Sequence, residues 1–169
     1  MKRAPAGFNW DNFDTNALKP FLKNDLFEGV LGKRELEMLS SEGLVKKTGT
    51  VLIGIHDPDS TFNLDEVVDG FDDVLEQMFW DVEEGPGRQK PISDEQASEL
   101  KNFIENNKGK RFMVHCHAGM SRSAGIACAV ECIVNYDGDV YNFKTGHSDV
   151  KAFKRYYPNW TVFDKIMGR

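Results

Sequence analysis

The sequence predicts an α/β fold, a single domain with a central, largely parallel sheet flanked by helices. Short apolar runs rich in β-branched residues alternate along the chain with segments of helical periodicity, an order typical of parallel sheets. A length of 169 residues suits one domain with a real hydrophobic core, and 40% hydrophobic with 28% charged residues is an ordinary globular composition. We therefore treat residues 1–169 as one domain, with residues 1–24 as an N-terminal extension that wraps around it.

The first half of the chain holds three candidate strands. Residues 25–31, DLFEGVL, form the first of them, and the segment KRELEMLSS that follows is a short helix. Residues 50–55, TVLIGI, are a compact apolar run that ends at the turn residues HDPDS, which indicates a buried strand. Residues 76–82, EQMFWDV, resemble a further strand ending in acidic residues. The segment before it, NLDEVVDGFDDVLEQ, stays ambiguous because a glycine interrupts its helical start.

The second half predicts a helix, a strand and another helix. Glycines and prolines in GPGRQKP mark an exposed loop, after which Ser93 and Gln96 have the spacing of a capping box at a helix start. This helix should end near NNKGK, where asparagine and glycine suit a left-handed cap. Residues 111–115, RFMVH, are the next strand and residues 121–136 the helix after it. Ligands of such sheets bind beyond the carboxyl ends of the strands, which is where Cys116 falls.

Charge and hydropathy narrow the class of function. No apolar run is long enough to span a bilayer, and the N-terminus lacks the apolar stretch of a secretory signal, so we expect a cytoplasmic protein without a membrane partner. The net charge of −6 argues against nucleic acid as a general partner. Basic residues gather late in the chain, however, and predict either a solvated helix face or a positive rim around an anion site. These residues are Lys144, Lys151, Lys154, Arg155, Lys165 and Arg169.

The three cysteines fall into two groups. Their odd number in a chain without a secretory signal argues against a disulfide framework. Cys128 and Cys132 are four residues apart in an apolar helical pattern and are expected to pack in the core. They are a poor metal pair because no second pair of ligands lies nearby in the sequence. Cys116, which stands between two histidines at the end of a predicted strand, needs a different explanation.

The loop after Cys116 is a candidate anion site. The first N–H groups of a helix lack intrahelical partners, and residues 117–122 would bring several of them around one phosphate-sized anion. Gly119 can adopt a positive φ or allow a close backbone approach. Arg122 adds a planar group that can bind two phosphate oxygens at once. The same positive field stabilises a thiolate, so Cys116 is the candidate nucleophile.

The segment HCHAGMSRS fits the pattern H-C-x-x-G-x-x-R-S/T, and the chain thereby resembles the cysteine-dependent protein tyrosine and dual-specificity phosphatases. Trp80 and Asp81 resemble the acid loop of that superfamily, with Asp81 35 residues before Cys116, although the Trp-Pro-Asp triplet is absent. Residues 156–166, YYPNWTVFDKI, are similar to the closing helix of small bacterial and viral members. The resemblance covers roughly residues 50–169 and implies a phosphatase-like α/β fold with the phosphate loop between a strand and a helix N-terminus.

The resemblance also implies a role for each residue of the site. Cys116 would attack phosphorus and form a phosphocysteine, while Arg122 and the loop amides stabilise the transferred group. Asp81 would protonate the leaving oxygen and then activate water, Ser123 would ease release of the thiolate, and His115 would orient the loop. Other carboxylates compete with Asp81 for the acid role, namely Glu83, Glu84, Asp72 and Asp73. The remaining loop positions, expected to contact phosphate or substrate, are His117, Ala118, Gly119, Met120 and Ser121.

The implied activity is metal-independent and cofactor-free hydrolysis of a phosphorylated protein, with phosphotyrosine as substrate and phosphoserine or phosphothreonine also open. The loop HAGMS lacks the lysines typical of relatives that act on inositol lipids. An RNA 5′-triphosphatase remains an alternative because some such relatives carry a histidine where His117 stands. A non-catalytic phosphate-binding module is the other, and a rhodanese-like or arsenate-reductase-like loop would not need Gly119 together with Arg122. His56 and His147 have no motif around them and are expected to be exposed or core residues.

Overall fold

The computed structural model describes residues 29–60, 65–82, 87–147 and 156–169. The predicted N-terminal extension and the start of the predicted first strand lie outside these ranges. The elements are β1 (Val30–Gly32), α1 (Lys33–Ser41), β2 (Thr50–His56), α2 (Asp65–Val68), β3 (Asp73–Met78), α3 (Asp94–Asn106), β4 (Arg111–Cys116), α4 (Arg122–Asn135), α5 (Val140–Gly146) and α6 (Trp160–Ile166).

The strands form one four-stranded sheet in the order β1–β4–β2–β3, and every pair is parallel. The predicted α/β class with a parallel sheet is therefore confirmed. Strand β4 lies between β1 and β2, and its last residues face glycines on both neighbours. Gly32 is opposite Cys116, and Gly54 is opposite His115. The carboxyl ends of three strands thus meet at one edge of the sheet, where the loop after β4 begins.

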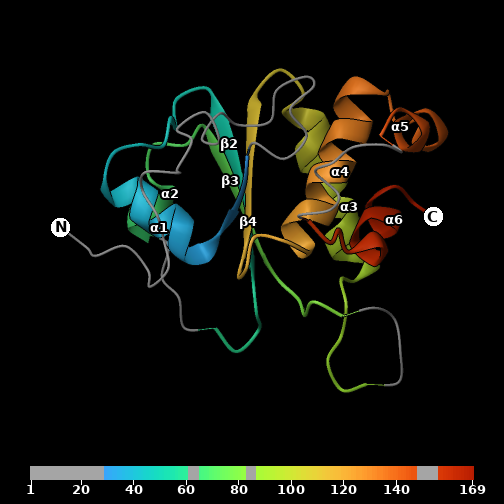
Figure 1. The fold of residues 1–169 in the computed structure, drawn as a ribbon, viewed down its shortest axis with the longest axis horizontal. Coiled ribbons are helices and arrows are strands. Elements are labelled where there is room, and N and C mark those ends of the chain that lie inside the picture. The colour runs from blue at the N-terminus through green and yellow to red at the C-terminus, as the bar shows by residue number, and fades with distance from the viewer. Residues whose placement is uncertain (1–28, 61–64, 83–86, 148–155) are drawn as a thin grey trace.

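Helices cover both faces of the sheet (Figure 1). Helices α1 and α2 lie on one face, α3, α4 and α6 lie on the other, and α5 packs on the outer side of α4. The side chains of β2 alternate between these layers: Ile53 and Ile55 join the α3–α4–α6 core, while Leu52 joins the core under α1 and α2. This two-sided burial explains why TVLIGI is apolar throughout instead of alternating with polar residues.

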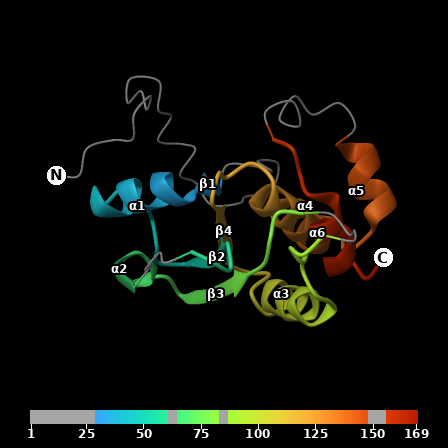
Figure 2. The same ribbon diagram turned by 90° about the horizontal axis from the view of Figure 1, so that it is seen from below.

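Helix α4 is the central helix of its layer. Its residues from Arg122 to Ile133 are all buried, because β4, α3, α5 and α6 surround it (Figure 2). Cys128 and Cys132 are both 0% exposed, so the prediction that they pack in the core is confirmed. The same burial places Arg122, at the first turn, inside the protein and not on its surface.

One predicted boundary and one predicted helix cap are wrong. The predicted strand 76–82 is in fact β3, Asp73–Met78, because this edge strand pairs only with β2 and the ladder stops where β2 ends at His56. Helix α3 starts with the predicted capping box of Ser93 and Gln96 but lacks the predicted left-handed cap. Asn107 has a φ of −118°, and its side chain donates to the carbonyl of Phe103 at 2.9 Å. That hydrogen bond provides a partner for one of the last carbonyl groups of the helix, which lack intrahelical donors.

Candidate active site

The loop between Cys116 and Arg122 is built closely against the neighbouring strand β1. Gly119 has a φ of +72°, and a Cβ added there would lie 2.4 Å from the backbone nitrogen of Gly32. The backbone N–H of Lys33, at the start of α1, donates to the carbonyl of His117 at 3.1 Å. Only glycine fits at position 119 because a side chain would be strained and would also collide with backbone.

Cys116 ends β4 with its side chain turned into the loop. The residue is 2% exposed, and its sulfur accepts a hydrogen bond from the Gly119 amide at 3.3 Å. The hydroxyl of Ser123, in the first turn of α4, lies 3.0 Å from the same sulfur. The thiol is thus placed at the amino end of a 14-residue helix, where free N–H groups and the helix dipole favour negative charge.

Arg122 begins α4 and is held from behind by two oxygens. Its Nη1 lies 2.7 Å from Asp57 Oδ1 and 2.7 Å from the carbonyl oxygen of Phe79. The residue is 3% exposed, yet its Nε has no hydrogen-bond partner among the described residues. The two Nη1 contacts fix the guanidinium in place, and its Nε is a buried donor that a bound anion would satisfy.

Asp57 did not emerge from the sequence as a site residue. It follows β2 directly, at the sheet edge where β4 also ends, and two residues separate it from Gly54, which faces His115. An acidic residue at the carboxyl end of a buried parallel strand is the signal that could have identified it.

Asp81 lies at the rim of the loop, where two side chains donate to the same carboxylate oxygen. The hydroxyl of Ser121 is 2.8 Å from Asp81 Oδ1, and the Asn159 amide nitrogen is 2.9 Å from it. Asn159 is also the N-cap of α6, with its own oxygen accepting from the amide of Val162. Asp81 is therefore held both by the start of α6 and by the loop between Cys116 and Arg122. The Pro-Asn pair before the helix was the signal in the sequence for Asn159.

The competing carboxylates are placed differently. Asp72 and Asp73 lie at the amino end of β3. Cys116 lies at the carboxyl end of β4, which is the other end of the parallel strands. Asp72 accepts a hydrogen bond from the Gly49 amide and pairs with Lys110, which lowers the pKa of its carboxyl. This placement at the far end of the strands favours Asp81 over both of them. Glu83 and Glu84 lie outside the described residues.

His115 precedes the loop and is completely buried. Its ring packs edge-on against that of His56 with 5.3 Å between centroids, and a Cβ on Gly54 would lie 2.5 Å from its Nε2. Burial, and then the nearby His56, lowers the pKa of His115 to about 3. His56 in turn lies 3.3 Å from Glu76 Oε1 and is 7% exposed. A neutral His115 therefore fills the space behind the loop at neutral pH.

The depressed pKa of His115 predicts a loss of stability in acid. Between pH 6.5 and about 3 the unfolded chain binds a proton that the folded protein does not, so stability rises with pH across this window. The group contributes at most about 1.4 kcal/mol per pH unit to the free energy of unfolding. In urea titrations, wild type should lose more stability than His115→Gln on going from about pH 7 to about pH 5. Equal losses in the two proteins would contradict the prediction.

The exposed positions of the loop form its outer rim. His117 and Ala118 are exposed, and Met120 is 45% exposed. The carbonyl of Met120 accepts from the amide of Tyr157 at 3.0 Å, and Tyr157 is itself 70% exposed. Two large apolar side chains thus project from neighbouring backbone beside the mouth of the loop.

The other titratable groups form no second catalytic cluster that we can identify in the described residues. Cys128 and Cys132 are free thiols in α4, and burial raises the pKa of both, that of Cys132 to about 11. His147 is buried and its Nδ1 lies 2.8 Å from the carbonyl oxygen of Phe143. Within residues 29–60, 65–82, 87–147 and 156–169, no group of three His, Cys, Asp or Glu side chains is arranged to hold a metal ion. The same ranges contain no helix of the length and apolarity that crossing a bilayer requires.

Comparison with solved structures gave distant likenesses, two of which are described here. No protein-family model and no curated protein matches the chain. The crystal structure of human tyrosine phosphatase-like serine/threonine/tyrosine-interacting protein is 22% identical, with 81% of this chain and 83% of that chain covered and a TM-score of 0.48. The active form of Tk-PTP is 20% identical, with 82% and 87% covered and a TM-score of 0.48. Likenesses this distant do not bear on the function of this chain.

Proposed function

We propose that this chain hydrolyses phosphoric monoesters on proteins through a phosphocysteine intermediate. The observation that carries the proposal is the loop geometry. A thiol and a buried arginine, whose Nε has no partner among the described residues, lie at the two ends of one short loop at the amino end of α4. Helix N–H groups and a fixed guanidinium provide the preorganised positive field that a transferring phosphoryl group needs.

The first step transfers the phosphoryl group to sulfur. The Cys116 thiolate attacks phosphorus in line with the leaving oxygen, an S–P bond forms and the P–O bond breaks. Arg122 and the loop amides stabilise the charge on the three equatorial oxygens. Asp81, held at the rim by Ser121 and Asn159, gives its proton to the leaving oxygen.

The second step releases phosphate. Asp81, now a carboxylate, takes a proton from a water molecule as that water attacks phosphorus, and the S–P bond breaks. The departing electron pair stays on sulfur, where the Ser123 hydroxyl at 3.0 Å can donate to the thiolate. The sum of both steps is one phosphomonoester and one water converted to an alcohol or phenol and inorganic phosphate.

The rim of the loop favours a phosphorylated aromatic side chain as substrate. Met120 and Tyr157 present exposed apolar surface beside the loop, and a tyrosine ring would bury it on binding. Phosphoserine and phosphothreonine end in shorter side chains, which would leave that surface exposed. We therefore place phosphotyrosine first among the protein substrates.

The proposal is tested by hydrolysis of p-nitrophenyl phosphate in the presence of a metal chelator. Wild type should release phosphate with no added metal, and iodoacetate should inactivate it by alkylating Cys116. Inorganic phosphate or vanadate should protect against this inactivation by occupying the loop. A folded protein that binds phosphate without turnover would instead support a non-catalytic phosphate-binding module.

Replacement of Asp81 tests the assignment of the acid. Asp81→Asn keeps the acceptor oxygen for Ser121 and Asn159 but cannot donate a carboxyl proton, so kcat should fall roughly 10²-fold or more with an alkyl phosphate. The loss should be smaller with p-nitrophenyl phosphate, whose leaving group needs little protonation. Asp73→Asn is the matched control, because Asp73 lies at the opposite edge of the sheet. Equal losses with both substrates would place the acid elsewhere.

A further inference from the structure

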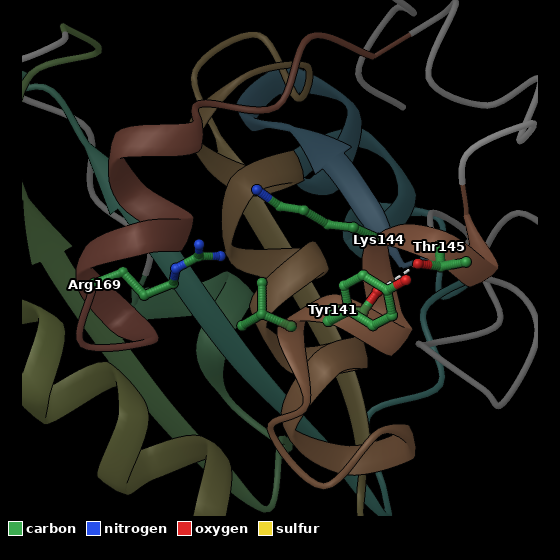
Figure 3. Close-up of a pocket in the computed structure, with 5 residues that line it drawn as sticks. Tyr141, Lys144, Thr145 and Arg169 are labelled. Atoms are coloured by element: carbon green, nitrogen blue, oxygen red, sulfur yellow. Dashed lines mark hydrogen bonds between the residues drawn. The ribbon is translucent and has the colours of Figure 1, made fainter.

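A pocket of about 520 Å³ lies between α5 and the end of the chain, apart from the loop. Val140, Tyr141, Lys144 and Thr145 line it from α5, and Arg169, which follows α6, closes the other side (Figure 3). A pocket of this size is large enough for one or two amino-acid side chains of a ligand.

Two cations, Lys144 and Arg169, face this pocket. Figure 3 shows Lys144 and Arg169 reaching toward one another from opposite sides. Within the described part of the chain, neither side chain forms an ion pair with a carboxylate. Lys165, from the same basic group of the sequence, is by contrast already paired with Asp94 at 3.0 Å. Among the described residues, the pocket therefore presents two cations that no carboxylate side chain pairs with directly.

The position of Lys144 is fixed by aromatic rings. Its Nζ lies 5.2 Å from the ring centroid of Trp160 and 5.6 Å from that of Phe163. Cation–π contacts of this kind hold the ammonium in place, which reduces the entropy lost when an anion binds. Tyr141, 78% exposed, adds an uncovered aromatic side chain, and Val140 adds apolar surface. Cations beside exposed apolar surface suit a ligand with acidic and apolar groups close together.

The pocket is linked to the candidate active site through α6. Trp160 directly follows Asn159, whose amide contacts Asp81 at 2.9 Å. Helix α4 begins at the phosphate loop and ends next to α5, and its 14 residues span about 21 Å. An extended peptide covers that distance with about six or seven residues, since each adds roughly 3.3 Å.

We propose that this pocket docks an acidic segment of the phosphoprotein substrate, about six or seven residues from the phosphorylated side chain. The inference rests on the proposed function and extends it to substrate choice. Charge complementarity carries it: the chain has a net charge of −6, so an acidic peptide is repelled on average and needs a local positive site to bind. Lys144 and Arg169 supply that site, while Tyr141 and Val140 contact apolar residues of the same segment.

The test uses two phosphotyrosine peptides of equal length whose flanking segment is glutamate–leucine in one and glutamine–leucine in the other. Wild type should show a KM roughly five- to tenfold lower for the acidic peptide, with similar kcat. The double variant Lys144→Ala/Arg169→Ala should lose this preference. Lys46→Ala/Lys108→Ala removes the same charge at exposed positions elsewhere and should keep it. If both double variants lost the preference for the acidic peptide equally, the preference would depend on net charge alone, and the proposal would be overturned.

A binding measurement separates this inference from the proposed function. The unphosphorylated glutamate–leucine peptide is titrated into wild type and both double variants by calorimetry, which needs no catalysis. Weaker binding in Lys144→Ala/Arg169→Ala alone supports the pocket even if the protein hydrolyses no phosphate ester. Binding that is absent from wild type, or identical in all three proteins, overturns the docking site even if hydrolysis proceeds.

Discussion

Cys116→Ser is expected to reduce metal-free hydrolysis of p-nitrophenyl phosphate by roughly 10⁴-fold or more. A serine hydroxyl is not ionised at neutral pH, whereas the cysteine site offers the Gly119 amide and the Ser123 hydroxyl to a thiolate. Serine is close in shape to cysteine and can accept the same two hydrogen bonds. The variant should therefore keep the fold and the capacity to bind inorganic phosphate while losing turnover.

The measurement compares kcat and phosphate binding in wild type, Cys116→Ser and a control. Cys132→Ala is the control because Cys132 is a buried thiol in α4 well away from the loop. It should retain wild-type kcat at a temperature where circular dichroism shows all three proteins folded. A kcat for Cys116→Ser close to that of wild type would exclude the phosphocysteine mechanism.

The parts of the site that lie close together in the sequence could be predicted from it. Strand, loop and helix follow one another between residues 111 and 136, so the apolar pattern and the glycine locate the loop without further information. The α/β class follows for the same reason, because each strand and helix carries its own periodicity. The helix α5 was missed, since its 7 residues carry little apolar pattern and only Phe143 among them is buried.

The contacts that depend on folding could not be predicted. Asn159 meets Asp81 across 78 residues, and Arg122 meets the carbonyl of Phe79 across 43. Nothing local in either segment indicates the partner, since the pairing follows from sheet order and helix packing. The end of β3 also depends on tertiary structure, because its pairing with β2 stops where β2 ends. Local chemistry can thus suggest a nucleophile, whereas the groups that position its partners come from the tertiary structure.

Arg122→Lys is the second large effect that we expect, a loss of roughly 10²- to 10³-fold in kcat/KM. Nη1 of Arg122 donates to Asp57 and to the Phe79 carbonyl, whereas Nε has no partner within the part of the chain that the structure describes. Lysine has one nitrogen for both tasks. If it binds the two fixed oxygens behind the loop, it cannot also bind phosphate, so inorganic phosphate binding should weaken together with catalysis.

Asp57→Asn distinguishes positioning from direct contact. The amide oxygen still accepts from Arg122 Nη1, but the charge that holds the guanidinium is gone, so we expect a smaller loss of about tenfold. In the double variant Asp57→Asn/Arg122→Lys, the loss should be less than the product of the two single losses, because Asp57 acts only through the arginine it holds. A loss in the double variant equal to the product of the two single losses would mean that Asp57 contributes independently of Arg122. That result would contradict the separate roles assigned to Nη1 and Nε.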